Sequence, residues 1–314
     1  MSTFQTLILI LATIALFLHG LEGFSREVRE VGATYFKQWL SKVTEKNLFG
    51  FILGVALTAL IQSSSAVSSI TVALVDAGII SFSKSLAVML GANVGTTSTA
   101  WLITFKIGQI APFCIVIGTI AGIVPGKAKL MGKSIFYFGL ILFSLDLISQ
   151  ATLPLKNHPV VPEILATTNN HLVGIVIGLA VTALVQSSSV TTGLSVILAQ
   201  QGILTTDGAV AIIIGSNVGT TSTALIASYT MNGAAKLAAR ANFMFNLIGV
   251  VVCFPFINSL DSLAANFTKD IGFQVAFAHL FFNLIITVVM LPLLKPFGRW
   301  LQKRWGEHVE TTIK

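Results

Sequence analysis

The sequence has few charged residues: they make up 10% of its 314 residues, whereas 54% are hydrophobic. A soluble globular domain has about 25% charged residues, so this chain cannot cover a water-facing surface. Intrinsic disorder is excluded because it requires low hydrophobicity and high charge. The apolar residues fall into runs of about 18 to 25, long enough for helices to cross a hydrocarbon core of about 30 Å. The sequence therefore predicts an all-α, polytopic helical membrane protein.

Cysteines and catalytic motifs are also scarce. Cys114 and Cys253 both lie inside apolar runs without metal-ligand spacing, so we expect both to be packing residues. The sequence contains no Gly-x-Ser-x-Gly elbow, no Walker loop and no His-Glu-x-x-His helix. We therefore expect no enzyme and no cofactor. Because no nucleotide-binding motif is present, any active transport by this chain must be driven by an ion gradient. The net charge of +7 fits the positive-inside bias of a membrane protein, so we expect a lipid bilayer and no nucleic acid as partner.

What the sequence does contain is an internal repeat. Residues 50–102 align without a gap to residues 174–226, at a constant offset of 124 residues, and about 24 of the 53 positions are identical. The same offset pairs Glu22 with Asp146; for these two, helix capping and a place on a cation path are both open. Chance does not produce such a match, so the chain is a duplicated unit of roughly 120 residues.

Lysine and arginine gather in the connection 26–46, in 125–133 and after residue 295, and the positive-inside rule places these segments in the cytoplasm. The connections 154–170 and 258–271 hold one lysine each and are expected outside. This arrangement predicts seven full spans and two hairpins, two repeats of inverted topology, an outside N-terminus and a cytoplasmic C-terminus. We expect a multi-pass plasma-membrane protein, in a bacterium the inner membrane. Inverted repeats place a transporter's substrate site near the bilayer midplane.

The expected organisation follows in chain order. It comprises repeat 1 at 1–124 (interfacial helix at about 26–46, hairpin at 47–80), repeat 2 at 131–258 (hairpin at 171–204), an extra span at 271–295 and a cytoplasmic tail at 296–314.

Each repeat contains a Gln-Ser-Ser-Ser element between two apolar stretches. Consecutive serines are poor helix formers, and non-helical backbone at membrane depth is tolerated only where it is buried in protein or lines a wet cavity. Packing of small residues between helices would explain a lone serine pair, but the duplication favours a functional site. The predicted breaks are formed by Gln62, Ser63, Ser64 and Ser65, and by Gln186, Ser187, Ser188 and Ser189.

Each repeat also contains Asn-Val-Gly-Thr-Thr-Ser-Thr, at 93–99 and 217–223. We expect the glycines around Asn93 and Asn217 to let each helix unwind in the membrane, giving a broken helix. The hydroxyls can then cap the restarted half-helix, whose N-terminus attracts an anion, and unwound oxygens suit a hard cation such as sodium. No Lys or Arg lies within the four elements, so we expect no basic side chain to hold the anion. The hydroxyl residues are Thr96, Thr97, Ser98, Thr220, Thr221 and Ser222.

Two late spans carry Asn246 and Asn283. A polar residue inside a membrane span is a functional hypothesis by default. A ligand role and an interhelical hydrogen bond are both open for these two asparagines.

At the paired Gln-Ser-Ser-Ser and Asn-Val-Gly-Thr-Thr-x-Thr elements, the chain resembles the type II sodium-dependent phosphate cotransporters in their short bacterial form. The resemblance covers residue 16 to about residue 294 and implies sodium-coupled symport of inorganic phosphate. It implies that the two Gln-Ser-Ser-Ser elements bind phosphate and sodium, with the six hydroxyl residues named above completing the site. The sodium ligands expected among all these residues are Gln62, Ser65, Asn93, Thr97, Gln186, Ser189, Asn217 and Thr221.

Two other functions are open from the sequence. The same site could discharge phosphate as an exporter, because direction depends on gradients and kinetics. A passive anion channel is the alternative from another class of protein.

Overall fold

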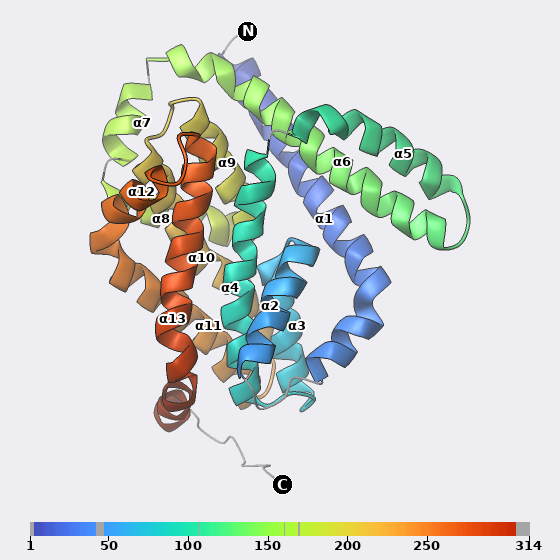
Figure 1. Ribbon diagram of the computed structural model, residues 1–314, viewed down its shortest axis with the longest axis vertical. Coiled ribbons are helices and arrows are strands. Elements are labelled where there is room, and N and C mark those ends of the chain that lie inside the picture. Colours follow the sequence, from blue (N-terminus) through green and yellow to red (C-terminus); the bar gives the residue numbers. More distant parts are fainter. Residues whose placement is uncertain (1–2, 42–46, 106, 160, 169, 306–314) are drawn as a thin grey trace.

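The computed structural model describes residues 3–41, 47–105, 107–159, 161–168 and 170–305. The described residues form helices and no strand, which confirms the all-α prediction (Figure 1). In chain order the helices are α1 (Thr3–Ser41), α2 (Asn47–Ile61), α3 (Ser64–Asp76), α4 (Phe82–Thr104), α5 (Ala111–Ile123), α6 (Lys127–Thr152), α7 (Val161–Thr168), α8 (His171–Val185), α9 (Ser188–Gln200), α10 (Thr206–Ser228), α11 (Gly233–Cys253), α12 (Ile257–Ala265) and α13 (Ile271–Trp305), with short 3₁₀ turns η1 (Ile107–Ile110), η2 (Leu153–Asn157) and η3 (Phe254–Phe256).

Six helical segments in the described part of the chain are long and apolar enough to cross a membrane. The predicted seventh span, at about 109–124, is too short: the apolar helix there covers Gly108–Ile123, the end of η1 and α5, or about 24 Å of helix against a core of about 30 Å. The prediction of seven spans is therefore wrong by this measure. The six candidates are Phe4–Glu30, Phe82–Thr104, Ala128–Lys156, Thr206–Ser228, Gly233–Ala265 and Ile271–Trp305.

Two pairs of short helices, α2–α3 and α8–α9, coincide with the predicted hairpins. In Figure 1 the first pair starts and ends toward the lower end of the molecule, where α4 begins, and the second pair returns toward the upper end, where α10 begins. Consequently α4 and α10 run in opposite directions. This arrangement is the one that an inverted repeat requires, and the topology relative to a bilayer stays a prediction.

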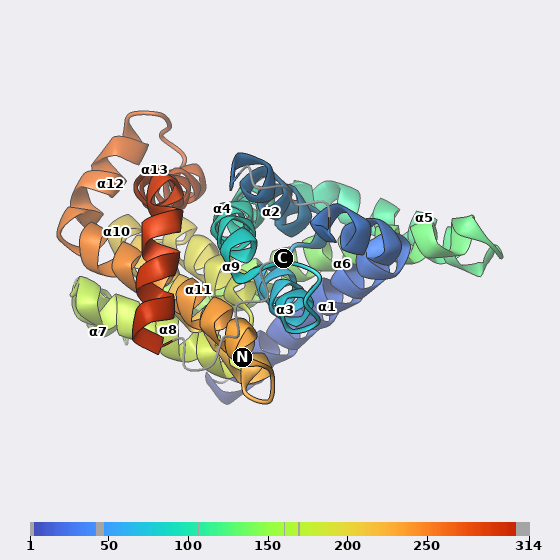
Figure 2. The ribbon, with the colours of Figure 1, turned by 90° about the horizontal axis from the view of Figure 1, so that it is seen from below.

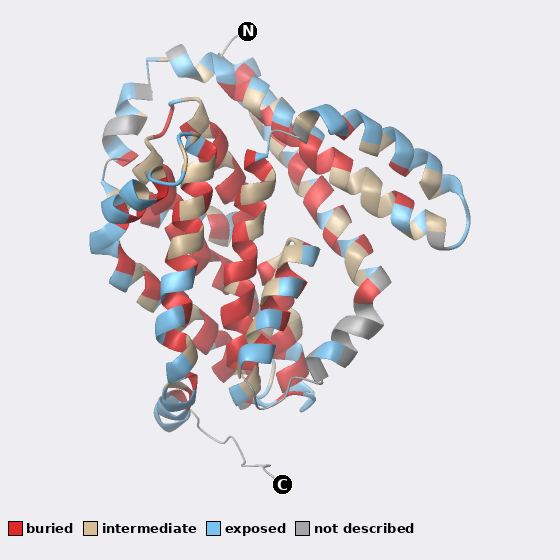
Figure 3. Ribbon diagram, in the orientation of Figure 1, coloured by how far each residue is buried: buried red, intermediate tan, exposed pale blue. Residues whose placement is uncertain are grey.

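The two most deeply buried candidate spans, α4 and α10, are continuous helices (Figure 3). The prediction that they break near Asn93 and Asn217 is wrong. The glycines in these elements serve close packing instead: a Cβ atom at Gly91 would collide with the backbone carbonyl of Phe51 in α2, and one at Gly215 with that of Ile175 in α8. Small residues let membrane helices approach this closely.

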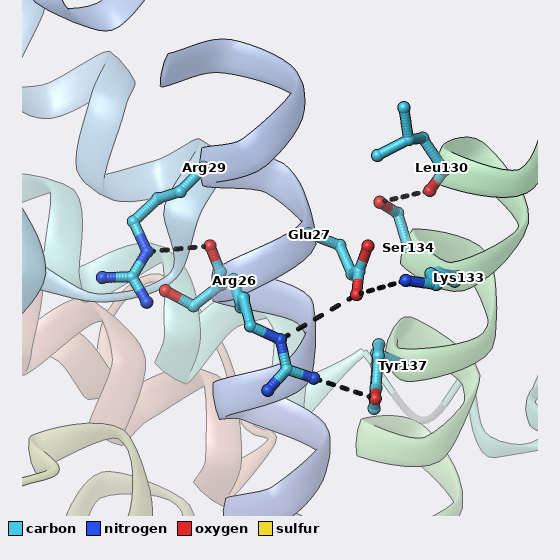
Figure 4. Close-up of polar contacts among 8 residues, drawn as sticks. Arg26, Glu27, Arg29, Leu130, Lys133, Ser134 and Tyr137 are labelled. Carbon is cyan, nitrogen blue, oxygen red and sulfur yellow. Dashed lines mark hydrogen bonds and ion pairs between the residues drawn. The ribbon is translucent and has the colours of Figure 1, made fainter. Parts of the chain in front are cut away.

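Helices α1, α5 and α6 form an arm beside this bundle, and α5 and α6 extend away from α13 (Figures 1 and 2). The exposed side of α5 is apolar, with Phe113, Ile120 and Ile123 all more than 60% exposed, as a lipid-facing surface requires. Where α1 meets α6, the buried Glu27 carboxylate lies 3.4 Å from the Lys133 ammonium group (Figure 4). This ion pair joins the first helix of repeat 1 to its counterpart in repeat 2.

Two boundaries differ from the prediction. Residues 26–41 are not a separate interfacial helix but continue α1 as one helix, and 42–46 lie outside the described residues. The segment after residue 295 is helical as far as it is described, because α13 continues through Pro296 to Trp305; its place in the cytoplasm stays a prediction. Gly298 lies there against Leu86 and Phe82 of α4, and this packing explains why the helix persists. Residues 306–314 lie outside the described residues.

Candidate functional site

The two Gln-Ser-Ser-Ser elements lie on one cavity of about 390 Å³. All eight of their residues line it, although they come from segments 124 positions apart in the sequence. The structure therefore brings the two tips together. The remaining lining residues are Leu18, Leu21, Glu22, Ser25, Arg29, Ala66, Leu184 and Val185.

Both tips are built around a glutamine in the left-handed backbone region. Gln62 and Gln186 each have a φ angle of 56°, and no other non-glycine residue in the described part of the chain has a positive φ. This conformation costs a residue with a Cβ about 1 kcal/mol or more, and such positions usually carry glycine or asparagine. A strained residue retained at equivalent positions of both repeats points to a function of the glutamine side chain.

At the first tip the glutamine side chain is tied to α4. Gln62 Nε2 donates to Ser98 Oγ at 3.0 Å, and Thr99 Oγ1 donates to Gln62 Oε1 at 3.0 Å. Ser63 caps α3, because its Oγ accepts from the Ala66 N–H at 3.2 Å. The hydrogen-bonding groups of this tip are therefore largely satisfied within the protein.

At the second tip the corresponding groups are free. Gln186 is exposed to the cavity, and Ser187 makes no side-chain cap on α9. The equivalents of Ser98 and Thr99 are Ser222 and Thr223, whose buried hydroxyl oxygens have no hydrogen-bond partner. The second tip therefore presents an uncapped helix N-terminus and an unpaired amide to the cavity.

Two buried serines complete the tips. Ser64 and Ser188 occupy equivalent positions, are 6% and 5% exposed, and line the cavity. Ser189 Oγ of the second tip donates to the Gln62 backbone carbonyl of the first at 3.5 Å. The tips are therefore in contact, and each contributes a largely buried serine to the lining of the same cavity.

The threonines of the second element do not line this cavity. Thr96 and Thr97 donate to the carbonyls of Ala92 and Val94 in their own helix, and Thr220 and Thr221 bond within α10 in the same way. They do not cap a restarted half-helix, because α4 and α10 are unbroken. Ser98 contacts the site only through Gln62, and Ser222 makes no such contact.

The asparagines lie in the interior of the bundle. His279 Nε2 and Asn217 Oδ1 are 3.4 Å apart. Asn246 and Asn283 each donate to a carbonyl one turn back in their own helix, and their buried Oδ1 atoms have no partner. Asn93 Nδ2 is also buried without a partner. These amides are available to a ligand but do not line the cavity of the tips.

The wall that α1 contributes was not predicted. Arg29 belongs to the segment 26–46, which was expected in the cytoplasm, yet Arg29 lines the cavity with Ser25 and Glu22. The expectation that no basic side chain faces the site is therefore wrong. The spacing of Glu22, Ser25 and Arg29 by three and four residues, which places them on one helix face, is the signal that could have revealed this wall.

This arrangement suits an oxyanion together with a hard cation. Serine hydroxyls, a helix N-terminus and a guanidinium group all donate hydrogen bonds to anions. Hydroxyl, amide and carboxylate oxygens are ligands for hard cations. Within the described ranges no three His, Cys, Asp or Glu side chains cluster as a transition-metal site would require.

The fold and the site thus define a polytopic helical membrane protein built around two paired serine-rich breaks. The chain belongs to the Na+/Pi-cotransporter family, whose model matches residues 16–150 and 159–286. This is a family of transporters and not of enzymes.

Curated relatives support the same assignment. The chain is 30% identical to the uncharacterized protein YqeW of Bacillus subtilis (strain 168), covering 92% of this chain and 94% of the relative. It is also 30% identical to "Putative inorganic phosphate export protein YjbB" of Escherichia coli (strain K12), covering 94% of this chain but only 55% of that longer protein. A sheep protein, sodium-dependent phosphate transport protein 2A, is 34% identical over 43% of this chain and 22% of its own length. No solved structure matches the chain.

Proposed function

We propose that this protein is a secondary active transporter that couples sodium to the movement of inorganic phosphate across the plasma membrane. The observation that carries the proposal is the single cavity that both tips share, with Ser64 and Ser188 from equivalent positions of the two repeats in its lining. Membership of the Na+/Pi-cotransporter family and the name of the sheep relative support phosphate and sodium as the transported ions.

Electrostatics favours a binding order. Sodium binds first at oxygen atoms of the tips and reduces the cost of bringing an anion into a membrane-embedded cavity. Phosphate then accepts hydrogen bonds from the serine hydroxyls and from the uncapped N-terminus of α9, where Ser187 leaves the first amides free. Movement of one repeat against the other then exposes the loaded site to the opposite side, as in other transporters with inverted repeats.

The test is radiolabelled phosphate uptake by the purified protein in liposomes under an imposed sodium gradient, with potassium replacing sodium as the control. Wild-type protein should accumulate phosphate only with sodium. Ser64→Ala and Ser188→Ala should each abolish this uptake, because each removes a hydroxyl donor from a residue that lines the cavity. Ser83→Ala, on the exposed first turn of α4, is the matched control and should transport normally. Full uptake by both cavity variants contradicts the proposal.

A second candidate is phosphate export through the same site, which the name of YjbB favours. Overexpression in whole cells distinguishes the two directions. An importer raises cellular phosphate when sodium is supplied outside, whereas an exporter speeds the release of preloaded phosphate and lowers the cellular content. Sodium-independent flux at channel rates would contradict both and identify a passive anion channel.

A further inference from the structure

One wall of the cavity is a polar stripe on α1. Leu18, Glu22, Ser25 and Arg29 follow one another at intervals of three and four residues and all line the cavity. Residues with this spacing share one face of a helix. Glu22 lies inside the candidate span Phe4–Glu30, and Arg29 lies at its charged end, two turns further along α1. An ionisable side chain inside a span marks a functional site by default, and Arg29 shares the cavity wall with Glu22.

Arg29 is directed differently from Arg26, its neighbour one turn earlier. The Arg26 guanidinium donates to Tyr137 Oη at 3.1 Å and lies 3.9 Å from the Glu27 carboxylate, so it faces α6. Arg29 points away from α6, on the other side of α1 (Figure 4). Its Nε donates to the Ser25 carbonyl at 3.2 Å, and its two terminal amino groups have no protein partner in the described structure. Four N–H donors of Arg29 are therefore available to the cavity.

The second repeat has the same stripe without the arginine. Leu142, Leu145, Asp146 and Ser149 lie 124 residues after Leu18, Leu21, Glu22 and Ser25, and they line a second cavity of about 420 Å³. The position equivalent to Arg29 is Leu153. Both walls therefore carry an acidic residue and a serine, but the basic group belongs only to the wall that faces the serine-rich tips.

We propose that Arg29 is a substrate-binding and specificity-determining residue, whose free guanidinium donors bind the oxyanion held by Ser64 and Ser188. This inference rests on the proposed function of the cavity. A guanidinium presents parallel donors that match two oxygens of a tetrahedral oxyanion. The two Gln-Ser-Ser-Ser and the two Asn-Val-Gly-Thr-Thr-Ser-Thr elements contain no Lys or Arg of their own. Glu22, two turns away on the same wall, is the other charged group lining the cavity, and it favours the entry of a cation alongside the anion.

The experiment compares Arg29→Gln, Arg29→Lys and the matched control Arg26→Gln. For each purified variant, the KM for phosphate and kcat are measured by uptake into liposomes under an inward sodium gradient. Thermal unfolding in detergent is followed with inorganic phosphate and with sulfate, both with and without sodium. Arg29→Gln should raise the KM about tenfold to a hundredfold, the loss expected for a hydrogen bond to a charged group, with a smaller change in kcat. Arg29→Lys keeps the charge and should recover part of the affinity. Arg26→Gln should keep the wild-type KM.

The outcomes separate this inference from the proposed function. An unchanged KM and unchanged phosphate-dependent stabilisation in Arg29→Gln overturn the role of Arg29 while sodium-driven uptake by the wild type stands. If the wild type shows no sodium-driven uptake, the proposed function fails; Arg29 is then judged by binding alone, and an oxyanion that stabilises the wild type but not Arg29→Gln supports it. Absence of oxyanion stabilisation in the wild type overturns both.

Discussion

The two Gln-Ser-Ser-Ser tips have the same sequence and the same backbone but different hydrogen bonds. Both glutamines have a φ angle of 56°, yet Gln62 is bonded to Ser98 and Thr99 of α4, whereas Gln186 turns into the cavity. This difference leaves two buried hydroxyls of α10, those of Ser222 and Thr223, without a hydrogen-bond partner. Identical motifs therefore occupy two different states in one molecule.

Under the proposed transport function, this asymmetry fits alternating access, in which one repeat moves against the other around a fixed site. A buried, unpaired hydroxyl is destabilising by about 1 to 3 kcal/mol, which favours a second state in which Gln186 turns toward Ser222 and Thr223 as Gln62 turns toward Ser98 and Thr99. We therefore expect the first tip to be a structural lock in this state and the second tip to be the mobile partner.

The largest loss of stability is expected at Gly91 and Gly215, where the two repeats pack in the same way. A Cβ atom at Gly91 or at Gly215 would collide with a backbone carbonyl of the facing short helix, so Gly91→Ala and Gly215→Ala should each lower the free energy of unfolding by about 3 kcal/mol. Thermal unfolding in detergent measures both. A large loss in one variant and none in the other would show that the asymmetry of the tips extends into the helix packing.

Substitution of the two glutamines should affect the stability of the protein to different extents. Gln62→Ala leaves Thr99 without its acceptor and should lower the free energy of unfolding by about 2 kcal/mol, whereas Gln186→Ala, which breaks no hydrogen bond in this state, should change it by less than about 0.5 kcal/mol. Both should lose phosphate transport, because each state needs one of the two glutamines. Equal unfolding temperatures for the two variants would contradict the lock at the first tip.

The smallest effects on stability are expected at Ser98, which accepts a hydrogen bond from Gln62, and at its equivalent Ser222. Ser98→Ala removes one hydrogen bond from Gln62 and should cost about 1 kcal/mol of stability. Ser222→Ala removes a hydroxyl that has no partner and should leave stability unchanged or slightly higher, while it slows transport by weakening the alternative state. Unfolding and uptake are measured on the same preparations, and a stability loss in Ser222→Ala equal to that in Ser98→Ala would disprove the difference.

The tips were predictable because a repeated run of serines in an apolar sequence has few structural explanations. Residues 62–65 and 186–189 do line one cavity. The unwound helices were predicted wrongly, since glycine permits both unwinding and close packing, and only the position of α2 and α8 shows that Gly91 and Gly215 serve packing. The seventh span failed on length: the apolar helix at Gly108–Ile123 nearly coincides with the predicted 109–124, but it is shorter than the roughly 20 residues that a span needs.

Composition and the repeat alone determine that this chain is a helical membrane protein with a duplicated polar element, because apolar runs and offset matches are properties of the linear sequence. Only the tertiary structure decides that Gln62, and not the equivalent Gln186, is hydrogen-bonded to the following long helix. It alone also places Arg29 of α1 in a cavity with serines from both repeats. The physical reason is that hydrogen bonds and cavity walls form between segments far apart in the chain. The two copies of the Gln-Ser-Ser-Ser element can therefore make different contacts in the folded protein.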